Sequence, residues 1–358
     1  MNCLHISNMY PSIKFPSFGT FVKETDDILS TVAHVERVVI DSKKKTTRDK
    51  IGQYFKFYVN IIKAVVRKKW DVIYIHFPSH TFIPVLISIF FIKSRVVINF
   101  HGGDAFNQPG RSTFFFKIKK IINHIAIKKS HVVVVPSEHF KELVCSKYNT
   151  PRLKVIVNYS GGVCTEKFRY VKRHDLSERK IRVVYAARME KVKDPLQVAK
   201  CVSNNSRQLE NFCFSFVGSG TLKEKVVDVL SSAENCSYSI SDSVAHKEIE
   251  KLFKDNDFVI QSSISESLGL VVLEAMATGC IPICRDIPAF RNIIDDRIDG
   301  LLFSTEADLL YCFKYIQNMN SIEVREMSRK AREKVVSRYS RSRSIEIMMK
   351  SVLNIESQ

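Results

Sequence analysis

Two glutamates separated by seven residues, Glu266 and Glu274, stand in a pattern that could bind a polar ligand. Residues 270–277 are rich in helix formers, and Gly279 stands where a helix stop is expected. The first turn of a helix carries unpaired N–H groups and partial positive charge, so it could receive a nucleotide phosphate. Glu266 could accept hydrogen bonds from sugar hydroxyls, and Gly269 would let a ligand approach the backbone. Spacing alone favours a plainer interpretation, in which Glu266 caps the helix and Glu274 is solvated.

The flanking segments predict how these residues are positioned. Residues 257–261 and 281–284 are short apolar runs typical of buried strands, and residues 270–277 form the helix between them. The order is therefore strand, loop, helix and strand, with Glu266 at the mouth of the helix.

The same alternation continues through the chain. In the first half, strands are predicted over 4–7, 35–40, 71–76, 95–100, 132–135 and 154–158, and helices over 51–69, 81–92 and 112–129. Strands that alternate with helices predict an α/β fold whose parallel sheets are covered on both faces.

Length and composition indicate two globular domains. The chain has 358 residues, of which 45% are hydrophobic, so each half can bury its own core. We expect domains over 1–165 and 166–335, with residues 336–358 as a helix that returns to the first domain.

The nine cysteines lack CxxC pairs, which favours a reducing, cytoplasmic setting. No signal-peptide pattern is seen, and the longest apolar run, 82–92, is shorter than the roughly 20 residues of a spanning helix.

Charge is distributed unevenly along the chain. The net charge is +18, and the first 160 residues hold 25 Lys and Arg against 10 Asp and Glu. This excess points to an anionic partner, either a membrane surface or a nucleic acid. Residues 112–129 read as a basic amphipathic helix that could lie in a membrane interface, or that packs its apolar face on the domain and leaves its lysines solvated. Stacked aromatic motifs and zinc spacings are lacking, so we expect no nucleic-acid partner.

The stretch from Glu266 to Ile283, E-S-L-G-L-V-V-L-E-A-M-A-T-G-C-I-P-I, resembles the E-x7-E motif of retaining glycosyltransferases of family 4. Those enzymes have the GT-B fold, with two Rossmann-like parallel-sheet domains facing across a cleft, and use nucleotide-sugar donors. The resemblance implies that the acceptor binds the first domain and the donor the second. It also implies that Glu266 contacts the donor sugar and Glu274 the nucleotide ribose.

Four further segments carry the resemblance. Arg188 and Lys193, after a strand predicted over 181–186, match the family's R-x4-K pair, whose cations hold the donor diphosphate. The sequence H-G-G-D from His101 is similar to a family loop in which the histidine meets a sugar or leaving phosphate, although its position alone fits equally a loop histidine without a ligand. Gly19 lies in a segment similar to the first βα loop of the family, and Gly218 in a glycine turn beside the nucleotide.

Carried over residue by residue, the resemblance implies catalytic roles for His101, Arg188, Lys193 and Glu266, and donor contacts from Gly19, Gly218, Ser267, Leu268, Gly269, Leu270 and Glu274. Two departures from the family pattern are visible. Gly161–Cys164 replaces the usual Asn-Gly-Val-Asp, and the glutamate that many relatives carry near Arg291 is missing.

The implied reaction transfers a sugar, with retention, from a UDP- or GDP-linked donor to a hydroxyl of a glycan or lipid-linked acceptor. No metal and no further cofactor are implied. The basic first domain suits an acceptor on an anionic membrane, as in bacterial surface polysaccharide or lipopolysaccharide assembly, with the enzyme peripheral on the cytoplasmic face. A nucleotide-sugar epimerase of the same two-domain shape is the first alternative, and a basic nucleic-acid-binding protein is the second.

Overall fold

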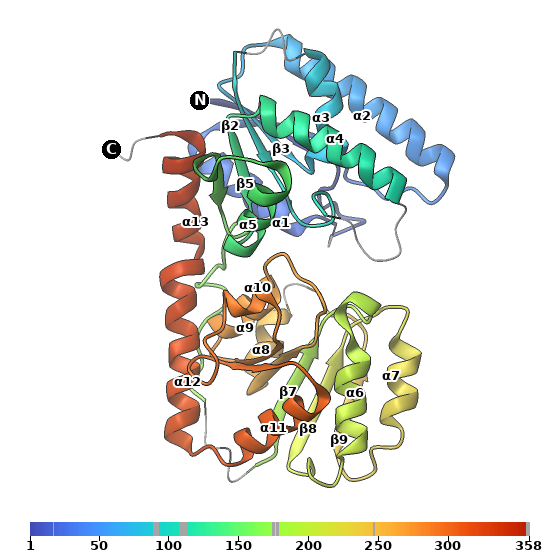
Figure 1. Cartoon of the computed structure of the whole chain (residues 1–358), viewed down its shortest axis with the longest axis vertical. Helices are drawn as coiled ribbons and strands as arrows, with labels where there is room; N and C mark the ends of the chain where they lie inside the picture. The colour runs from blue at the N-terminus through green and yellow to red at the C-terminus, as the bar shows by residue number, and fades with distance from the viewer. Residues whose placement is uncertain are drawn as a thin grey trace. The chain divides into compact units, whose positions relative to one another are not determined.

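The computed structural model describes residues 1–16, 18–88, 93–106, 113–173, 176, 179–245 and 248–355. The chain forms two compact units. The first unit comprises Met1–Gly162 and Ser342–Gln358, and the second comprises Val163–Arg341. Figure 1 shows the elements of each unit.

The first unit is built on a parallel six-stranded sheet in the order β2-β1-β3-β4-β5-β6. Its strands are β1 (Asn2–Ser7), β2 (His34–Val39), β3 (Val72–His76), β4 (Arg95–Asn99), β5 (Val132–Val135) and β6 (Val155–Val157). Strand β5 consists of four valines, all of them buried, as expected for a strand covered on both faces. The order reverses between β1 and β3, which creates a topological switch point at their carboxyl ends.

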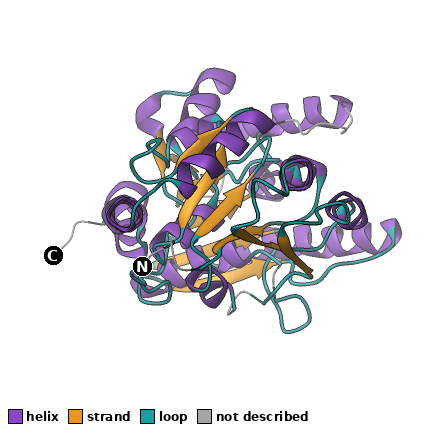
Figure 2. Cartoon of the chain, turned by 90° about the horizontal axis from the view of Figure 1, so that it is seen from below, coloured by secondary structure: helices purple, strands orange, loops and turns teal. Residues whose placement is uncertain are grey.

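Helices cover both faces of this sheet (Figure 1), and Figure 2 shows the helices and strands of the chain by colour. They are α1 (Thr20–Val32), α2 (Thr47–Arg67), α3 (Pro78–Ser88), α4 (Thr113–Lys129) and α5 (Glu138–Tyr148). Helix α2 begins where the hydroxyl of Thr46 accepts a hydrogen bond from the Asp49 N–H at 3.1 Å. Residues 89–92 and Ser112, which the sequence assigns to helices, lie outside the described residues.

The C-terminal segment belongs to the first unit. Helix α13 (Arg341–Ile347) continues into a π-helical stretch, Met348–Leu353, whose apolar side chains join a core formed with β1, β3 and α1. The guanidinium of Arg95 donates to the carbonyl of Val352 at 2.8 Å. The first unit thus contains Ser342–Gln358 from the end of the chain, whereas residues 336–341 of the segment predicted to return to the first domain belong to the second unit.

The second unit repeats the architecture, with a parallel sheet in the order β12-β11-β10-β7-β8-β9. Its strands are β7 (Ile181–Ala186), β8 (Phe212–Val217), β9 (Ser237–Ser241), β10 (Phe258–Gln261), β11 (Ile281–Arg285) and β12 (Leu301–Phe303). Its helices are α6 (Pro195–Asn204), α7 (Lys223–Leu230), α8 (Ile249–Lys254), α9 (Leu270–Ala277), α10 (Pro288–Arg291), α11 (Glu306–Gln317) and α12 (Ser321–Lys334). The switch point of this sheet lies between β7 and β10.

Two observations complete the fold. All nine cysteines lie in the described ranges and are free thiols. Within those ranges, the structure contains no helix with the length and apolar character that crossing a bilayer requires.

Candidate active site

The switch point of the second sheet brings two distant charges together. Lys193 follows β7 and Glu266 follows β10, and these strands are neighbours, so their carboxyl ends share one edge. The ammonium of Lys193 forms an ion pair with Oε1 of Glu266, and their side chains are 19% and 15% exposed. The Ser263 hydroxyl donates to the same carboxylate oxygen at 2.8 Å. The pair is thus largely enclosed but still reachable by a ligand.

The turn that carries Lys193 is fixed by hydrogen bonds to its backbone. The Tyr185 hydroxyl donates to the Lys193 carbonyl at 3.1 Å, and the Ser262 hydroxyl reaches the carbonyls of Lys193 and Asp194 at 3.0 and 2.7 Å. Asp194 has a left-handed backbone and pairs its carboxylate with Arg285 at 3.0 Å. These contacts hold the Lys193 backbone against the end of β10.

Gly269 begins helix α9 beside this ion pair. Its φ of 95° is in the left-handed region, and a Cβ there would lie 2.6 Å from Cε1 of Phe290, so only glycine fits without strain. Gly269, the residue at the N-cap, has no side chain that could cap the helix. The N–H of Val272 donates to the Gly269 carbonyl at 2.9 Å, so an anion at this helix end would meet the N–H groups of Leu270 and Val271. Ser267 and Leu270 are partly exposed there, whereas Leu268 is buried.

Glu274 lies one turn into α9. It is 5% exposed, so its carboxylate is not the solvated surface charge of the plainer sequence interpretation. Its predicted contact with a ribose stays a prediction.

Gly218 follows directly after β8 and packs against the segment that follows β7. A Cβ on Gly218 would lie 1.9 Å from the carbonyl oxygen of Ala187, and the N–H of Met189 donates to the Ser219 carbonyl at 3.0 Å. The glycine turn therefore packs directly on the backbone that carries Arg188. Arg188 is exposed, and its guanidinium has no hydrogen-bond or ion-pair partner within the described ranges. The structure thus joins Lys193 to Glu266 but does not join the Arg188 side chain to either.

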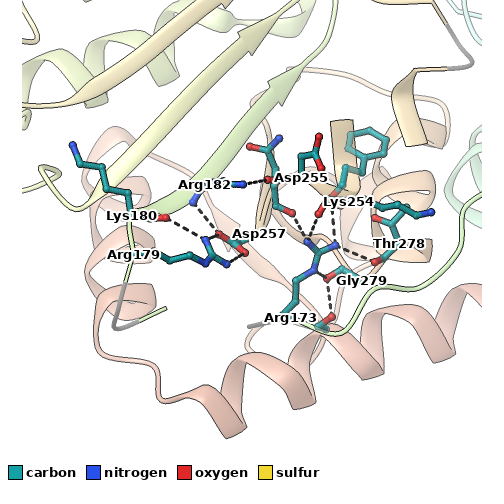
Figure 3. A network of polar contacts seen from close by, with 12 residues as sticks. Arg173, Arg179, Lys180, Arg182, Lys254, Asp255, Asp257, Thr278 and Gly279 are labelled. Atoms are coloured by element: carbon teal, nitrogen blue, oxygen red, sulfur yellow. Dashed lines mark hydrogen bonds and ion pairs between the residues drawn. The ribbon is translucent and has the colours of Figure 1, made fainter. Parts of the chain in front are cut away.

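The opposite end of α9 is anchored by a buried arginine (Figure 3). Arg173 is 3% exposed. Its guanidinium donates to the carbonyls of Phe253, Lys254, Asn256, Thr278 and Gly279. Because these carbonyls lie at and beyond the ends of α8 and α9, the cation also opposes the negative ends of both helix dipoles.

In the first unit, His101 lies directly after β4. Its Nε2 is 2.7 Å from Nδ1 of His76, and its ring also contacts the rings of Phe21 and Phe77. Asp104 accepts hydrogen bonds from the N–H groups of His101 and Gly102, which fixes the loop. Burial lowers the pKa of His101 to about 3 and raises that of Asp104 to about 6.

Gly19 directly precedes helix α1, and Phe21 in the first turn of that helix contacts His101. Gly19 has a φ of 83°, and a Cβ there would lie 3.0 Å from the carbonyl oxygen of Met9. Two residues later, the ring of Phe21 lies 4.7 Å from that of His101, measured between centroids. In the first unit, therefore, it is Phe21 that contacts His101, and in the second unit the residues around Lys193 form their own cluster.

Several residues of these clusters were not predicted from sequence, namely His5, Asp26, His76, Tyr185, Ser262 and Arg285. A polar residue inside an apolar run is the signal that could have marked some of them, as with His5 in β1 and His76 in β3. The described part of the chain contains no group of three or more His, Cys, Asp or Glu side chains able to hold a metal ion.

Comparisons with known proteins identify relatives of this chain. An uncharacterized 41.2-kDa protein in the cps region of Klebsiella pneumoniae is 24% identical over 270 residues, 72% of this chain and 71% of that protein. Two further relatives match over only about half of their own length, 48% and 51%.

Solved structures share the fold. Sucrose-phosphate synthase from Thermosynechococcus elongatus has a TM-score of 0.76 and 14% identity, with 97% of each chain covered. Anabaena HepE in complex with UDP and glucose has a TM-score of 0.73 and 14% identity, over 99% of this chain and 100% of that one.

Two family models match separate halves of the chain. The model described as Glycosyltransferase Family 4 matches residues 22–161, and the model described as Glycosyl transferases group 1 matches residues 166–334. These matches and the two parallel sheets confirm the predicted GT-B fold and the family resemblance. The chain therefore belongs to the glycosyltransferases, its first half to Glycosyltransferase Family 4 and its second half to Glycosyl transferases group 1.

Proposed function

We propose that the protein transfers a sugar, with retention, from a UDP- or GDP-linked donor to a hydroxyl of a glycan or lipid-linked acceptor. The observation that carries the proposal is the Lys193–Glu266 ion pair beside the uncapped first turn of α9. A cation and free N–H groups suit a diphosphate, and a neighbouring carboxylate suits the hydroxyls of the attached sugar. HepE, which shares the fold, binds UDP and glucose, and this favours a uridine donor.

In the proposed reaction, the bond between the anomeric carbon and the phosphate oxygen breaks, and a bond from that carbon to the acceptor oxygen forms on the same face. The acceptor's proton passes to the departing phosphate. Lys193, Arg188 and the first turn of α9 stabilise the charge that develops on the diphosphate, and Glu266 orients the sugar. Glu274 holds the ribose, and Gly19, Gly218 and Ser267–Leu270 line the path of the donor.

His101 is proposed to hydrogen-bond a substrate oxygen. Because burial lowers its pKa to about 3, it does so as a neutral imidazole at pH 7. A neutral ring can direct an oxygen by a hydrogen bond but contributes no full charge to the developing diphosphate. That task falls to the two cations of the second unit.

The acceptor is proposed to lie at an anionic membrane. The first half of the chain carries the charge excess, and helix α3 packs against both α2 and α4. These three helices expose large apolar side chains, namely Ile51, Phe55, Ile83, Ile87, Phe114, Phe115, Ile118 and Ile121. The inner face of α4 packs on the core through Ala126 and Ile127, and its exposed apolar side chains are the ones proposed to meet the membrane. The relative in a cps region favours surface polysaccharide as the product.

A thermal-shift screen with UDP, GDP and their common sugars, followed by incubation with the labelled donor and an acceptor extract, tests the proposal. We expect a rise in melting temperature with one nucleotide series and a labelled product whose anomeric configuration matches the donor. Inversion at the anomeric centre would contradict retention. Conversion of the donor to its epimer without transfer would identify an epimerase instead.

A further inference from the structure

Three histidines come from neighbouring strands at the switch point of the first sheet. His5 lies in β1, His76 ends β3 and His101 follows β4. His5 and His76 are fully buried, and their ring centroids are 4.8 Å apart. Nδ1 of His5 lies 2.9 Å from Oδ1 of Asp26, a buried carboxylate of α1. His101 alone keeps some exposed surface, so it is the member of the group that a substrate can reach.

The rings of His76 and His101 are joined edge to edge. Their planes are 9° apart, their centroids are 4.9 Å apart and the two nitrogens are 2.7 Å apart. The distance between the centroids nearly equals the N···N distance plus the distance from each centroid to its own nitrogen. The two nitrogens therefore lie close to the line that joins the centroids. The rings are therefore nearly coplanar, and one proton lies between Nδ1 of His76 and Nε2 of His101.

The remaining nitrogen of His76 decides which ring carries that proton. Nε2 of His76 is buried and has no hydrogen-bond partner in the described part of the chain. If His101 donated, His76 would have to carry its own proton on Nε2, as a buried N–H without an acceptor. If His76 donates from Nδ1, its Nε2 carries only a lone pair, and no buried N–H is left without an acceptor. A buried donor left unpaired is the costlier arrangement, so the contacts favour donation from His76.

We infer that His76 is a positioning residue that holds His101 in the tautomer with its proton on Nδ1, so that His101 offers a neutral N–H to a substrate oxygen. Nδ1 of His101 makes no hydrogen bond with the described residues, and is therefore available for that contact. Free neutral histidine in water prefers its proton on Nε2, so His76 imposes the rarer form. The inference rests on the proposed function for the identity of the oxygen, whereas the tautomer follows from the contacts alone.

Burial of the two rings also favours the neutral forms that this tautomer requires. It lowers the pKa of His76 and holds that of His101 at about 3, which keeps both rings neutral and leaves a single shared proton. A donor N–H fixed in place before the substrate arrives stabilises developing negative charge on an oxygen without reorganisation. The role of His76 is to set the orientation and the proton of His101, without touching the substrate itself.

The direct test is a long-range proton–nitrogen NMR spectrum of the full chain labelled with 15N-histidine. The His101 signals are assigned by their loss in His101→Gln. At neutral pH, we expect a protonated Nδ1 and an unprotonated Nε2 for His101 in the wild type, and the reverse in His76→Leu. A wild-type His101 protonated on Nε2, or on both nitrogens, would overturn the inference even if His76→Leu does not fold.

Transfer kinetics provide the second test. We expect His76→Leu to lower kcat by at least about tenfold with KM changed by less than about twofold, because the substrate still binds but meets the wrong tautomer. His76→Asn keeps a hydrogen-bonding group at the same distance from the backbone and should recover most of kcat. His124→Leu, an exposed site on α4, is the control and should behave as the wild type.

Equal kcat for His76→Leu and the wild type would refute the positioning role. The two proposals also fail separately. If the wild type transfers no sugar from any nucleotide-sugar, the proposed function is wrong, and the spectrum still decides the tautomer of His101.

Discussion

Lys193 and Glu266 form an ion pair although 73 residues separate them in the chain. The contact exists because β7 and β10 are paired strands at the point where the sheet order reverses, so that the loops after them meet. In the free protein each charge compensates the other. A donor diphosphate would compete for the ammonium and release the carboxylate to the sugar, which links donor binding to the arrangement of both groups.

Replacing Lys193 with methionine should lower kcat/KM for transfer by about 10²–10³-fold, because one stabilising charge on the departing diphosphate is lost. Initial rates and a UDP titration by calorimetry measure the effect. Lys191→Met is the matched control, since Lys191 is exposed two residues away. An equal loss in both variants would show that Lys193 acts only through the general charge of the loop.

Gly269→Ala should reduce the free energy of unfolding by about 1–3 kcal/mol, because it combines a positive φ with a clash against Phe290. It should also weaken nucleotide binding, since α9 would shift. Gly52→Ala is the contrast: Gly52 lies inside α2 with open space around it, so alanine should stabilise by about 0.5–1 kcal/mol. Urea unfolding followed by circular dichroism compares the two, and a neutral Gly269→Ala would contradict the strain argument.

Arg173→Met should destabilise the second unit by about 3–5 kcal/mol, because several buried carbonyls lose their donor at once. Arg173→Lys should recover part of the loss, as an ammonium has three donors. Arg182→Met tests whether any nearby arginine would have the same effect. Arg182 is exposed, so its removal should cost less than about 0.5 kcal/mol. Thermal unfolding ranks the three variants, and similar melting temperatures would show that water replaces the guanidinium.

The Asp26 carboxylate should make the first unit sensitive to acid. Burial alone would raise the pKa of Asp26, but hydrogen bonds from His5, Tyr10 and Arg37 lower it to about 2. Because this lies below the value of 3.8 for an unperturbed Asp, the group contributes stability above about pH 4, and the contribution is lost as the pH falls through about 2. The difference in unfolding free energy between the wild type and Asp26→Asn should therefore shrink by about 2 kcal/mol over that range.

Fluorescence of Trp70, the single tryptophan and a buried residue of the first unit, follows this transition. Asp27→Asn is the control, because Asp27 is a partly exposed neighbour paired with Lys23 at the surface. A difference that stays constant from pH 4 to pH 2 would show that the Asp26 network does not lower its pKa.

Reversing charge on α4 should weaken binding to vesicles that contain anionic phosphatidylglycerol. Lys117→Glu with Lys120→Glu removes two exposed cations and adds two anions, and the loss should be largest at low salt. Sedimentation of the protein with vesicles measures it. Lys200→Glu with Lys225→Glu, an exposed pair in the second unit, makes the same change in net charge and should bind normally. Binding that persists at high salt in the α4 variant would exclude an electrostatic role for this helix.

Most elements were predictable because their sequence patterns are local. Helix α9 has the bounds that were predicted, 270–277, since helix formers lie between a left-handed glycine and Gly279. Strand β9 was missed. Its residues Ser237–Ser241 are mostly polar and partly exposed, because it is an edge strand that pairs only with β8. An edge strand needs no apolar run, so its sequence resembled a loop.

The α/β class, the two-sheet organisation and the candidates Arg188, Lys193, Glu266 and Gly269 could all be predicted from the residues alone. These follow from periodicity, turn residues and short motifs, all of which act over a few neighbouring positions. The contact of Lys193 with Glu266, the 2.7 Å approach of His76 to His101 and the anchoring of α9 by Arg173 emerge only from the folded chain. The physical reason is that such contacts depend on which strands pair and in what register, and no local pattern encodes which distant side chains that pairing brings together.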